Sequence, residues 1–168
     1  MKVAVLMGSD SDLERLQPCL DTLRGLEIPF VARVLSAHRT PEDLVRFVEE
    51  APEQGVSVFV CAAGGAAHLA GVVAAHTRLP VLGVPMDNPP LGGLDALLST
   101  VQMPGGVPVG SLGTGAGGPV NAALLAARIL ALSDSDLARR VEDHRSAQAS
   151  TVRAKDARLQ DRLEGTDP

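Results

Sequence analysis

Five short apolar runs recur along the chain, and each is bounded by Gly, Pro, Ser or Asp residues. All are rich in valine. Continuous apolar runs of this length are typical of strands covered on both faces, whereas half-exposed strands alternate apolar and polar residues. The runs that we predict to be strands are VAVLM from Val3, FVARVL from Phe30, VSVFVCAA from Val56, PVLGVP from Pro80 and GVPVGSL from Gly106.

Helical patterns of apolar residues alternate with these runs and cover residues 12–24, 41–51, 66–76, 91–101 and 119–132. Gly25 lies just past the first, where a helix stop is expected, and Pro18 lies inside it, where it should bend the axis. A strand followed by a helix, five times over, predicts a parallel sheet with right-handed crossovers. The expected fold class is α/β, a three-layer open parallel sheet whose ligand site lies at the carboxyl ends of the strands.

The pattern changes after residue 133. The tail is dense in Arg, Asp and Glu, and its apolar residues are too widely spaced for a wide apolar face. It predicts a mostly solvated helix that packs on its own domain or on a neighbouring subunit. We therefore divide the chain into a single α/β domain, residues 1–133, and a C-terminal helical extension, residues 134–168, whose extreme end we expect to be frayed.

Composition narrows the classes of partner. A chain of 168 residues suffices for one domain with a real core, and with three Phe and no Trp or Tyr that core must consist of small aliphatic residues. A net charge of −5 argues against binding to nucleic acid. No apolar stretch approaches the ~20 residues that span a membrane, and no signal sequence precedes the first run. We expect a cytoplasmic protein without membrane contact.

Few residues outside the strand ends suggest chemistry. Cys19 and Cys61 have apolar neighbours and no C-x-x-C spacing, which favours buried free thiols. His76 and His144 do not cluster with other polar groups of the strand ends. The Gly64-Gly65 tract is not a G-x-G-x-x-G fingerprint, and the scarcity of aromatic residues disfavours a flavin. No dinucleotide, flavin or metal is expected.

Three polar segments follow the first three predicted strands, at residues 8–12 (GSDSD), 36–41 (SAHRTP) and 64–68 (GGAAH). Because the carboxyl ends of parallel strands meet at one edge of a sheet, these segments should converge. The convergence is the functional signal, since each segment alone also has a purely structural interpretation.

The first two segments suit an anion. Ser9 and Ser11 can donate to a phosphate at a helix start, although Asp12 would repel one and helix capping explains this segment equally well. Arg39 adds a permanent cation with a fork of donors. Thr40 is a plausible N-cap, because Pro41 suits the first position of the next helix.

The two histidines suit proton transfer. His38 lies beside Arg39, opposite the Ser/Asp turn, and imidazole exchanges protons near neutral pH. A lone loop histidine is more often an ordinary surface residue, and His68, in the first turn of the third predicted helix, could simply cap or pack. Gly64 and Gly65 would let the backbone approach a ligand, although tight packing also favours glycine.

Five motifs, GSDSD, SAHRTP, AGGAAHLAG, STVQMPGGVPVG and NAALLAARIL, occur in an order and spacing that closely resemble the PurE family of purine biosynthesis, in its bacterial mutase class. The resemblance covers about residues 3–150. It implies a flavodoxin-like fold, a homo-octamer, and conversion of N5-carboxyaminoimidazole ribonucleotide to 4-carboxy-5-aminoimidazole ribonucleotide in de novo purine (IMP) biosynthesis without metal or organic cofactor. Residues 1–133 would then form the catalytic domain.

The resemblance also implies roles for individual residues. The phosphate of the ribonucleotide would be held by Ser9, Ser36 and Arg39, with Ser11 as a second donor, and the ribose hydroxyls by Asp12. His38 would give and take back the proton, and His68 is a second candidate catalytic residue. The small residues Gly65, Ala66 and Ala67 would wall a dry pocket around the base, and Gly64, Gly65 and Ala66 are the candidates there for contact with the substrate.

Two departures from the family pattern bear on pocket shape: Ala70 stands where the family usually has Pro, and residues 113–121 differ in detail. Two alternatives stay open, a carboxylase that adds CO2 directly to aminoimidazole ribonucleotide, and a non-catalytic nucleotide sensor. The tract GGAAHL at residues 64–69 is similar to the mutase branch, since the carboxylase branch typically has an Arg-Ser-Asn type of tract there.

Overall fold

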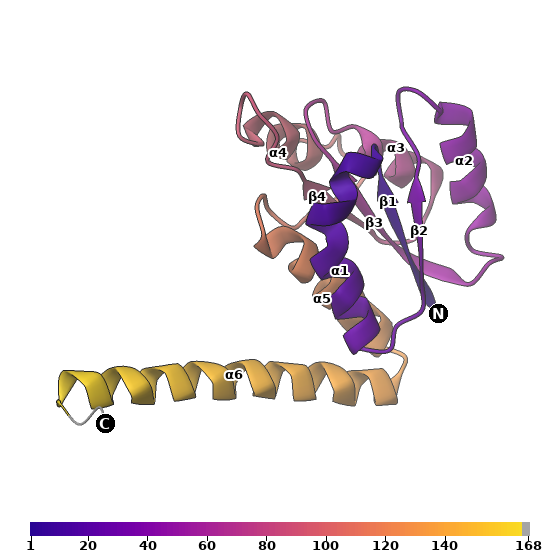
Figure 1. Ribbon diagram of the computed structural model, residues 1–168. Coiled ribbons are helices and arrows are strands. Elements are labelled where there is room, and N and C mark those ends of the chain that lie inside the picture. The colour runs from indigo at the N-terminus through magenta and orange to yellow at the C-terminus, as the bar shows by residue number, and fades with distance from the viewer. Residues whose placement is uncertain (166–168) are drawn as a thin grey trace.

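The computed structural model describes residues 1–165 and contains one all-parallel sheet with the strand order β2-β1-β3-β4-β5 (Figure 1). This is the flavodoxin-like order, with a crevice where the order reverses between β1 and β3. The predicted three-layer α/β fold is confirmed. The strands are β1 (Lys2–Met7), β2 (Phe30–Val34), β3 (Val56–Ala63), β4 (Val81–Pro85) and β5 (Gly110–Ser111).

Helices cover both faces of the sheet, and the five predicted helices are all present. Side chains of α1 and α5 pack on one face, and those of α2 and α3 pack on the other. A short 3-10 helix, η1 (Asp10–Asp12), precedes the first α-helix. The α-helices are α1 (Leu13–Gly25), α2 (Pro41–Glu50), α3 (Leu69–His76), α4 (Leu94–Val101), α5 (Gly117–Ala131) and α6 (Ser135–Leu163).

Burial of the strands follows their place in the sheet. Successive residues of β1 are buried on alternate faces, Val5 in one core cluster and Leu6 in the other, so both faces are covered. The same expectation is wrong for β2, where Val34 is 51% exposed, because β2 is an edge strand. The fifth predicted strand is also shorter than expected, since only Gly110 and Ser111 pair with β4. Pro108, two residues before Gly110, has no N–H to give to a ladder.

Two smaller expectations for the α/β domain concern Pro18 and the cysteines. Helix α1 continues through Pro18, whose carbonyl accepts a hydrogen bond from the Thr22 hydroxyl at 2.7 Å. Cys19 and Cys61 are buried free thiols, as expected. Burial raises the pKa of Cys19 to about 12 and raises that of Cys61 as well, so both thiols stay protonated.

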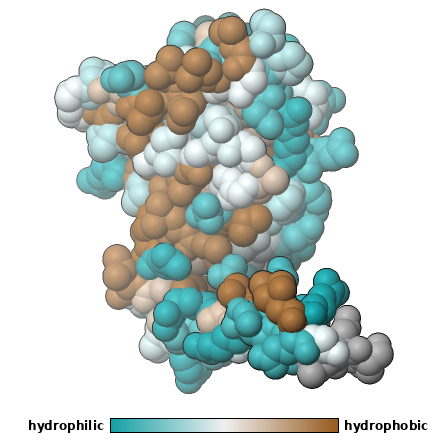
Figure 2. All heavy atoms as spheres, turned by 90° about the vertical axis from the view of Figure 1, so that its left-hand side faces the viewer, coloured by the Kyte–Doolittle hydropathy of each residue, from teal (hydrophilic) through white to brown (hydrophobic). Residues whose placement is uncertain are grey.

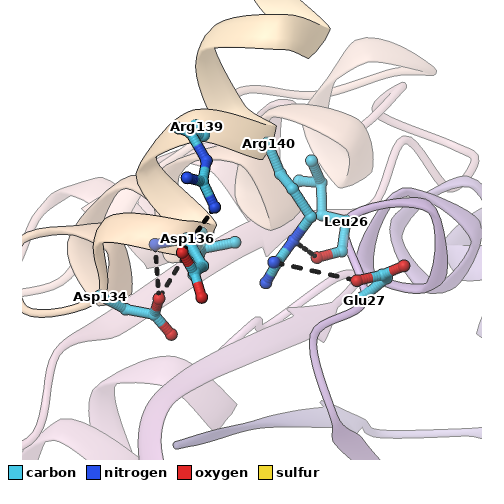
Figure 3. Close-up of polar contacts among 7 residues, drawn as sticks. Leu26, Glu27, Asp134, Asp136, Arg139 and Arg140 are labelled. Carbon is cyan, nitrogen blue, oxygen red and sulfur yellow. Dashed lines mark hydrogen bonds and ion pairs between the residues drawn. The ribbon is translucent and has the colours of Figure 1, made fainter.

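The C-terminal extension is one long helix, α6, that projects away from the body (Figure 1). Asp134 caps it by accepting from the backbone N–H groups of Asp136 and Leu137. Its first turns are anchored because Leu137 is buried and Arg140 donates to the Leu26 carbonyl at 2.9 Å (Figure 3). Val141 packs against the core and His144 is half-buried, and from Arg145 on the helix is exposed. The predicted frayed end includes residues 166–168, which lie outside the described residues.

Within residues 1–165, no helix combines the length and the apolar character that crossing a membrane requires.

Gly83 lets α4 approach the sheet, and its replacement by Ala should destabilise the protein. A Cβ at this position of β4 would overlap Cγ2 of buried Thr100 and lie 3.1 Å from Cγ1 of Val109. We expect Gly83→Ala to lower the free energy of unfolding by about 1–3 kcal/mol, measured by urea denaturation. Gly25→Ala is the control, since nothing lies within 4 Å of its Cβ. Equal loss in both variants would contradict this account.

Candidate active site

A cavity of about 200 Å³ lies at the carboxyl ends of four neighbouring strands. Its lining comes from the segments that follow β1, β2, β3 and β4, so the predicted convergence of the first three segments is observed. Gly65, although predicted, is not among the lining residues. The lining residues are Gly8, Ser9, Ser11, Asp12, Ser36, Ala37, His38, Arg39, Ala63, Gly64, Ala66, His68, Leu69 and Asn88.

The segment after β1 is a hydroxyl-rich turn. Ser9 is the N-cap of η1, and its Oγ accepts from the backbone N–H of Ser11 at 3.3 Å and from the Ser11 hydroxyl at 2.9 Å. Capping is therefore a real role of this serine, and the cavity lining is a second one. Asp10 is exposed and lies outside the lining.

Asp12 is the one carboxylate among the described lining residues, and it is only 6% exposed. Burial raises its pKa above the ordinary value, while the backbone N–H of Ser9 and the charge of Arg15 act in the opposite direction. A poorly hydrated carboxylate at a cavity wall is a strong acceptor for the hydroxyl groups of a ligand.

Replacing Asp12 by Asn should therefore stabilise the protein at neutral pH. Because its folded-state pKa is raised above 3.8, ionised Asp12 costs stability above that folded-state value, and the cost disappears once pH falls below 3.8. We expect the gain of Asp12→Asn in urea denaturation to be largest at pH 7 and to shrink towards pH 4. An equal gain at both pH values would contradict this origin. Exposed Asp10→Asn is the control.

The segment after β2 is braced internally and reaches across to β1. Oγ of Ser36 accepts from the backbone N–H of Arg39 at 3.2 Å, and Nη2 of Arg39 donates to the Gly8 carbonyl at 2.8 Å. No carboxylate among residues 1–165 forms an ion pair with Arg39, so its charge faces the cavity uncompensated. Thr40 occupies the N-cap position of α2 without a side-chain capping bond, and instead its hydroxyl binds both backbone groups of Ser36.

The two predicted histidines contact each other. Nε2 of His38 lies 2.9 Å from Nδ1 of His68, and the rings meet edge to face with centroids 4.9 Å apart. A hydrogen bond between two imidazoles needs one donor and one acceptor nitrogen, so the tautomers of the two rings are coupled. His68 is the N-cap residue of α3 but makes no side-chain capping bond, so the capping alternative for its ring is not what the structure shows.

The glycines after β3 have different structural reasons. Gly65 has a φ of 63°, which favours glycine, whereas Gly64 has no positive φ. At Gly64 a Cβ would overlap the side-chain amide nitrogen of Asn88, so the absence of a side chain makes room for Asn88. Small side chains continue along the wall with Ala66 and with Ala67, which is buried.

Metal-ligating side chains are not gathered at this site. Over the described part of the chain, no three His, Cys, Asp or Glu residues are grouped so that they could hold a metal ion.

Asn88 was missed by sequence reasoning. It follows the fourth strand, and the rule that located the other three segments also applies to that strand end. The polar pair Asp87-Asn88 was the available signal.

Comparison with known proteins identifies the family. The family model described as AIR carboxylase matches residues 2–151. The chain belongs to this family. Its relatives include proteins named N5-carboxyaminoimidazole ribonucleotide mutase from Brucella melitensis, 54% identical over 89% of this chain and 93% of that protein, and from Escherichia coli K12, 50% identical over 90% and 89%.

A solved family member has the same fold. The crystal structure of Treponema denticola PurE matches with a TM-score of 0.86 at 29% identity, over 94% of this chain and 98% of that one. The predicted resemblance to the PurE family is thus confirmed.

Proposed function

We propose that this protein is an N5-carboxyaminoimidazole ribonucleotide mutase, an isomerase of purine biosynthesis. The observation that carries the proposal is one cavity that joins an unpaired arginine and serine hydroxyls at one end to a bonded histidine pair. A phosphorylated sugar suits the first end, and a base that must exchange protons suits the second. Relatives of that name at about 50% identity support the same assignment.

In the proposed complex the phosphate binds Arg39 and the hydroxyls of Ser9, Ser11 and Ser36. The ribose hydroxyls donate to Asp12. This arrangement explains why a carboxylate lies beside a phosphate site. The ribose hydroxyls can donate hydrogen bonds to a carboxylate, whereas the ionised phosphate can only accept them. The aminoimidazole then lies against Gly64, Ala66 and the histidine pair, with Gly65 shaping the backbone of that wall.

The proposed reaction moves the carboxylate in two steps. The bond between the exocyclic nitrogen and the carboxylate carbon breaks, CO2 is released, and the nitrogen gains a proton. A bond then forms between that CO2 and C4, which loses its proton. His38 gives the proton in the first step and takes one back in the second, so the enzyme ends in its starting state. His68 holds the His38 ring in place by their mutual hydrogen bond.

Retention of CO2 requires a small, dry space next to the base. Ala66 and Leu69 line the cavity, and Ala67, which lies between them in the chain, is buried. Such side chains hydrate neither the carboxylate nor the released CO2, which favours decarboxylation and recapture over escape.

The test is incubation of the protein with N5-carboxyaminoimidazole ribonucleotide while the C4-carboxylated product is followed. Product formation without added bicarbonate supports the mutase. Tight binding without turnover would favour a nucleotide sensor, which needs Ser9, Asp12 and Arg39 but has no use for His38.

The family description, AIR carboxylase, makes the direct carboxylase the second candidate. A single turnover in excess labelled bicarbonate separates the two reactions. The mutase should transfer the carboxylate already on the substrate, so little label enters the first product formed. Full label in that product would assign CO2 to the solvent and overturn the mutase assignment.

We further propose a closed homo-oligomer, an octamer, acting in the cytoplasm. Four exposed apolar residues run along α4 and the turn before it, and hydrophobic surface is extensive on this side of the molecule (Figure 2). A monomer rarely leaves so much apolar surface exposed. These residues are Leu91, Leu94, Leu98 and Val101.

Light scattering at micromolar concentration should therefore give a mass near eight times 17.4 kDa. The double variant Leu94→Glu, Leu98→Glu should lower that mass, because it places two charges among the four exposed apolar residues of α4 and the turn before it. A stable wild-type monomer would contradict the proposed assembly.

A further inference from the structure

The segment after β4 carries a side chain to which the proposed reaction assigns no role. Asn88 lines the cavity, and its Oδ1 accepts a hydrogen bond from Nη1 of Arg15 at 2.6 Å. The same Nη1 donates to Oδ1 of Asp87 at 2.8 Å. Arg15 thus joins the first turn of α1 to two successive residues of the segment after β4.

This contact fixes which way the Asn88 amide points. A guanidinium can only donate, so the atom of Asn88 that it binds must be the oxygen. The amide nitrogen therefore lies on the other side and packs against Gly64, at the point where a Cβ would overlap it. Among residues 1–165, no acceptor hydrogen-bonds to that nitrogen. Two N–H groups are thus left for a ligand at the cavity wall.

The strand order places Asn88 at the end of the cavity that is remote from Arg39. Arg39 follows the edge strand β2, whereas Asn88 follows β4, with β1 and β3 between them. A ribonucleotide whose phosphate lies at Arg39 therefore directs its base, and the carboxylate on that base, towards Gly64 and Asn88.

The segment is also held in shape without a ligand. Gly93 has a φ of 84° and lies so close to Asp87 that a Cβ there would be 2.7 Å from the Asp87 Cα. Residues 87–93 are therefore folded back on themselves, and Arg15 ties their first two residues to α1. Such preorganisation is what an orienting donor requires.

We propose that Asn88 is a specificity-determining residue that donates from its amide nitrogen to the carboxylate of the ribonucleotide, and that Arg15 is the positioning residue that holds this orientation. The inference rests on the proposed function. A neutral donor suits the reaction because a full positive charge would stabilise the carboxylate most in the ground state, before CO2 leaves. The charge of Arg15 is offset by Asp87, so it does not act as that cation.

The test compares the affinities of two ligands, 4-carboxy-5-aminoimidazole ribonucleotide and aminoimidazole ribonucleotide, which differ only in the carboxylate. Asn88→Asp has the same shape and can keep its bond to Arg15, but turns an acceptor oxygen towards the ligand. We expect it to weaken the carboxylated ligand ~10-fold or more while the other changes less than ~3-fold. The ratio of the affinity for the carboxylated ligand to the affinity for aminoimidazole ribonucleotide should therefore fall. Asn88→Ala should also lower this ratio, by a smaller factor.

Arg15→Met should also lower this affinity ratio, because the side-chain amide of Asn88 is then free to flip. The matched control is Arg24→Met on the same helix, which removes an exposed ion pair with Asp21 and should leave the ratio unchanged. Equal weakening of both ligands in the Asn88 variants would indicate a merely structural role and overturn the inference.

Turnover by the wild-type protein keeps the two proposals apart. If the wild-type protein isomerises the substrate and the affinity ratio of the two ligands is unchanged in the Asn88 variants, the inference is wrong and the proposed function stands. If it binds both ligands without turnover, the proposed function falls, while a lowered ratio would still support carboxylate recognition by Asn88.

Discussion

Replacing His38 by Asn should lower turnover of N5-carboxyaminoimidazole ribonucleotide by a factor of ~10² or more while leaving its binding nearly intact. The reason is that an amide can occupy the place of the imidazole and still bond to His68, but it cannot give and take back a proton. The phosphate and ribose contacts lie on other side chains, so KM should change far less than kcat. Steady-state kinetics with both constants resolved is the measurement.

His76→Asn is the matched control for this variant. His76 is exposed at the end of α3 and lies outside the cavity, so its replacement should leave both constants unchanged. Near wild-type turnover of His38→Asn would remove His38 from the proton-transfer role. A loss confined to KM would instead assign it to binding.

The sequence was sufficient to place three of the four cavity segments, because one rule governs them. Strands that run parallel bring their carboxyl ends to one edge, so Ser9, Ser36 and Gly64 had to approach one another once the five strands were recognised. The rule predicts which segments lie near one another, but it does not predict which side chains are in contact. That His38 and His68 bond at 2.9 Å depends on how two loops and the start of α3 pack, which no local pattern encodes.

The misses have the same physical origin. The run from Phe30 has the composition of a covered strand, but the order β2-β1-β3-β4-β5 makes it an edge, and spatial order is not written in chain order. Asn88 was passed over because its importance lies in a bond to Arg15, 73 residues earlier in the chain. Long-range side-chain pairs of this kind become visible only when the fold is known.

Removal of the Arg39 charge is the second change with a large expected effect. Arg39→Leu should weaken binding of the ribonucleotide roughly 10- to 100-fold, because charge-assisted hydrogen bonds to a phosphate are lost from a site with no other arginine or lysine among its described lining residues. The affinity of Arg39→Lys for the ribonucleotide should lie between those of the wild-type protein and Arg39→Leu, since lysine restores the charge without the fork of donors.

The decisive comparison uses the corresponding nucleoside, which lacks the phosphate. If Arg39 acts on the phosphate, the nucleoside should bind the wild-type protein and Arg39→Leu with the same weak affinity. Arg39 also donates to the Gly8 carbonyl, so a variant that merely disturbed the β1 and β2 segments would weaken the nucleoside too. Arg46→Leu, which breaks the exposed ion pair with Asp43 on α2, should change neither ligand. Equal losses for nucleotide and nucleoside in Arg39→Leu would therefore contradict the phosphate site and leave Arg39 as a brace between two loops.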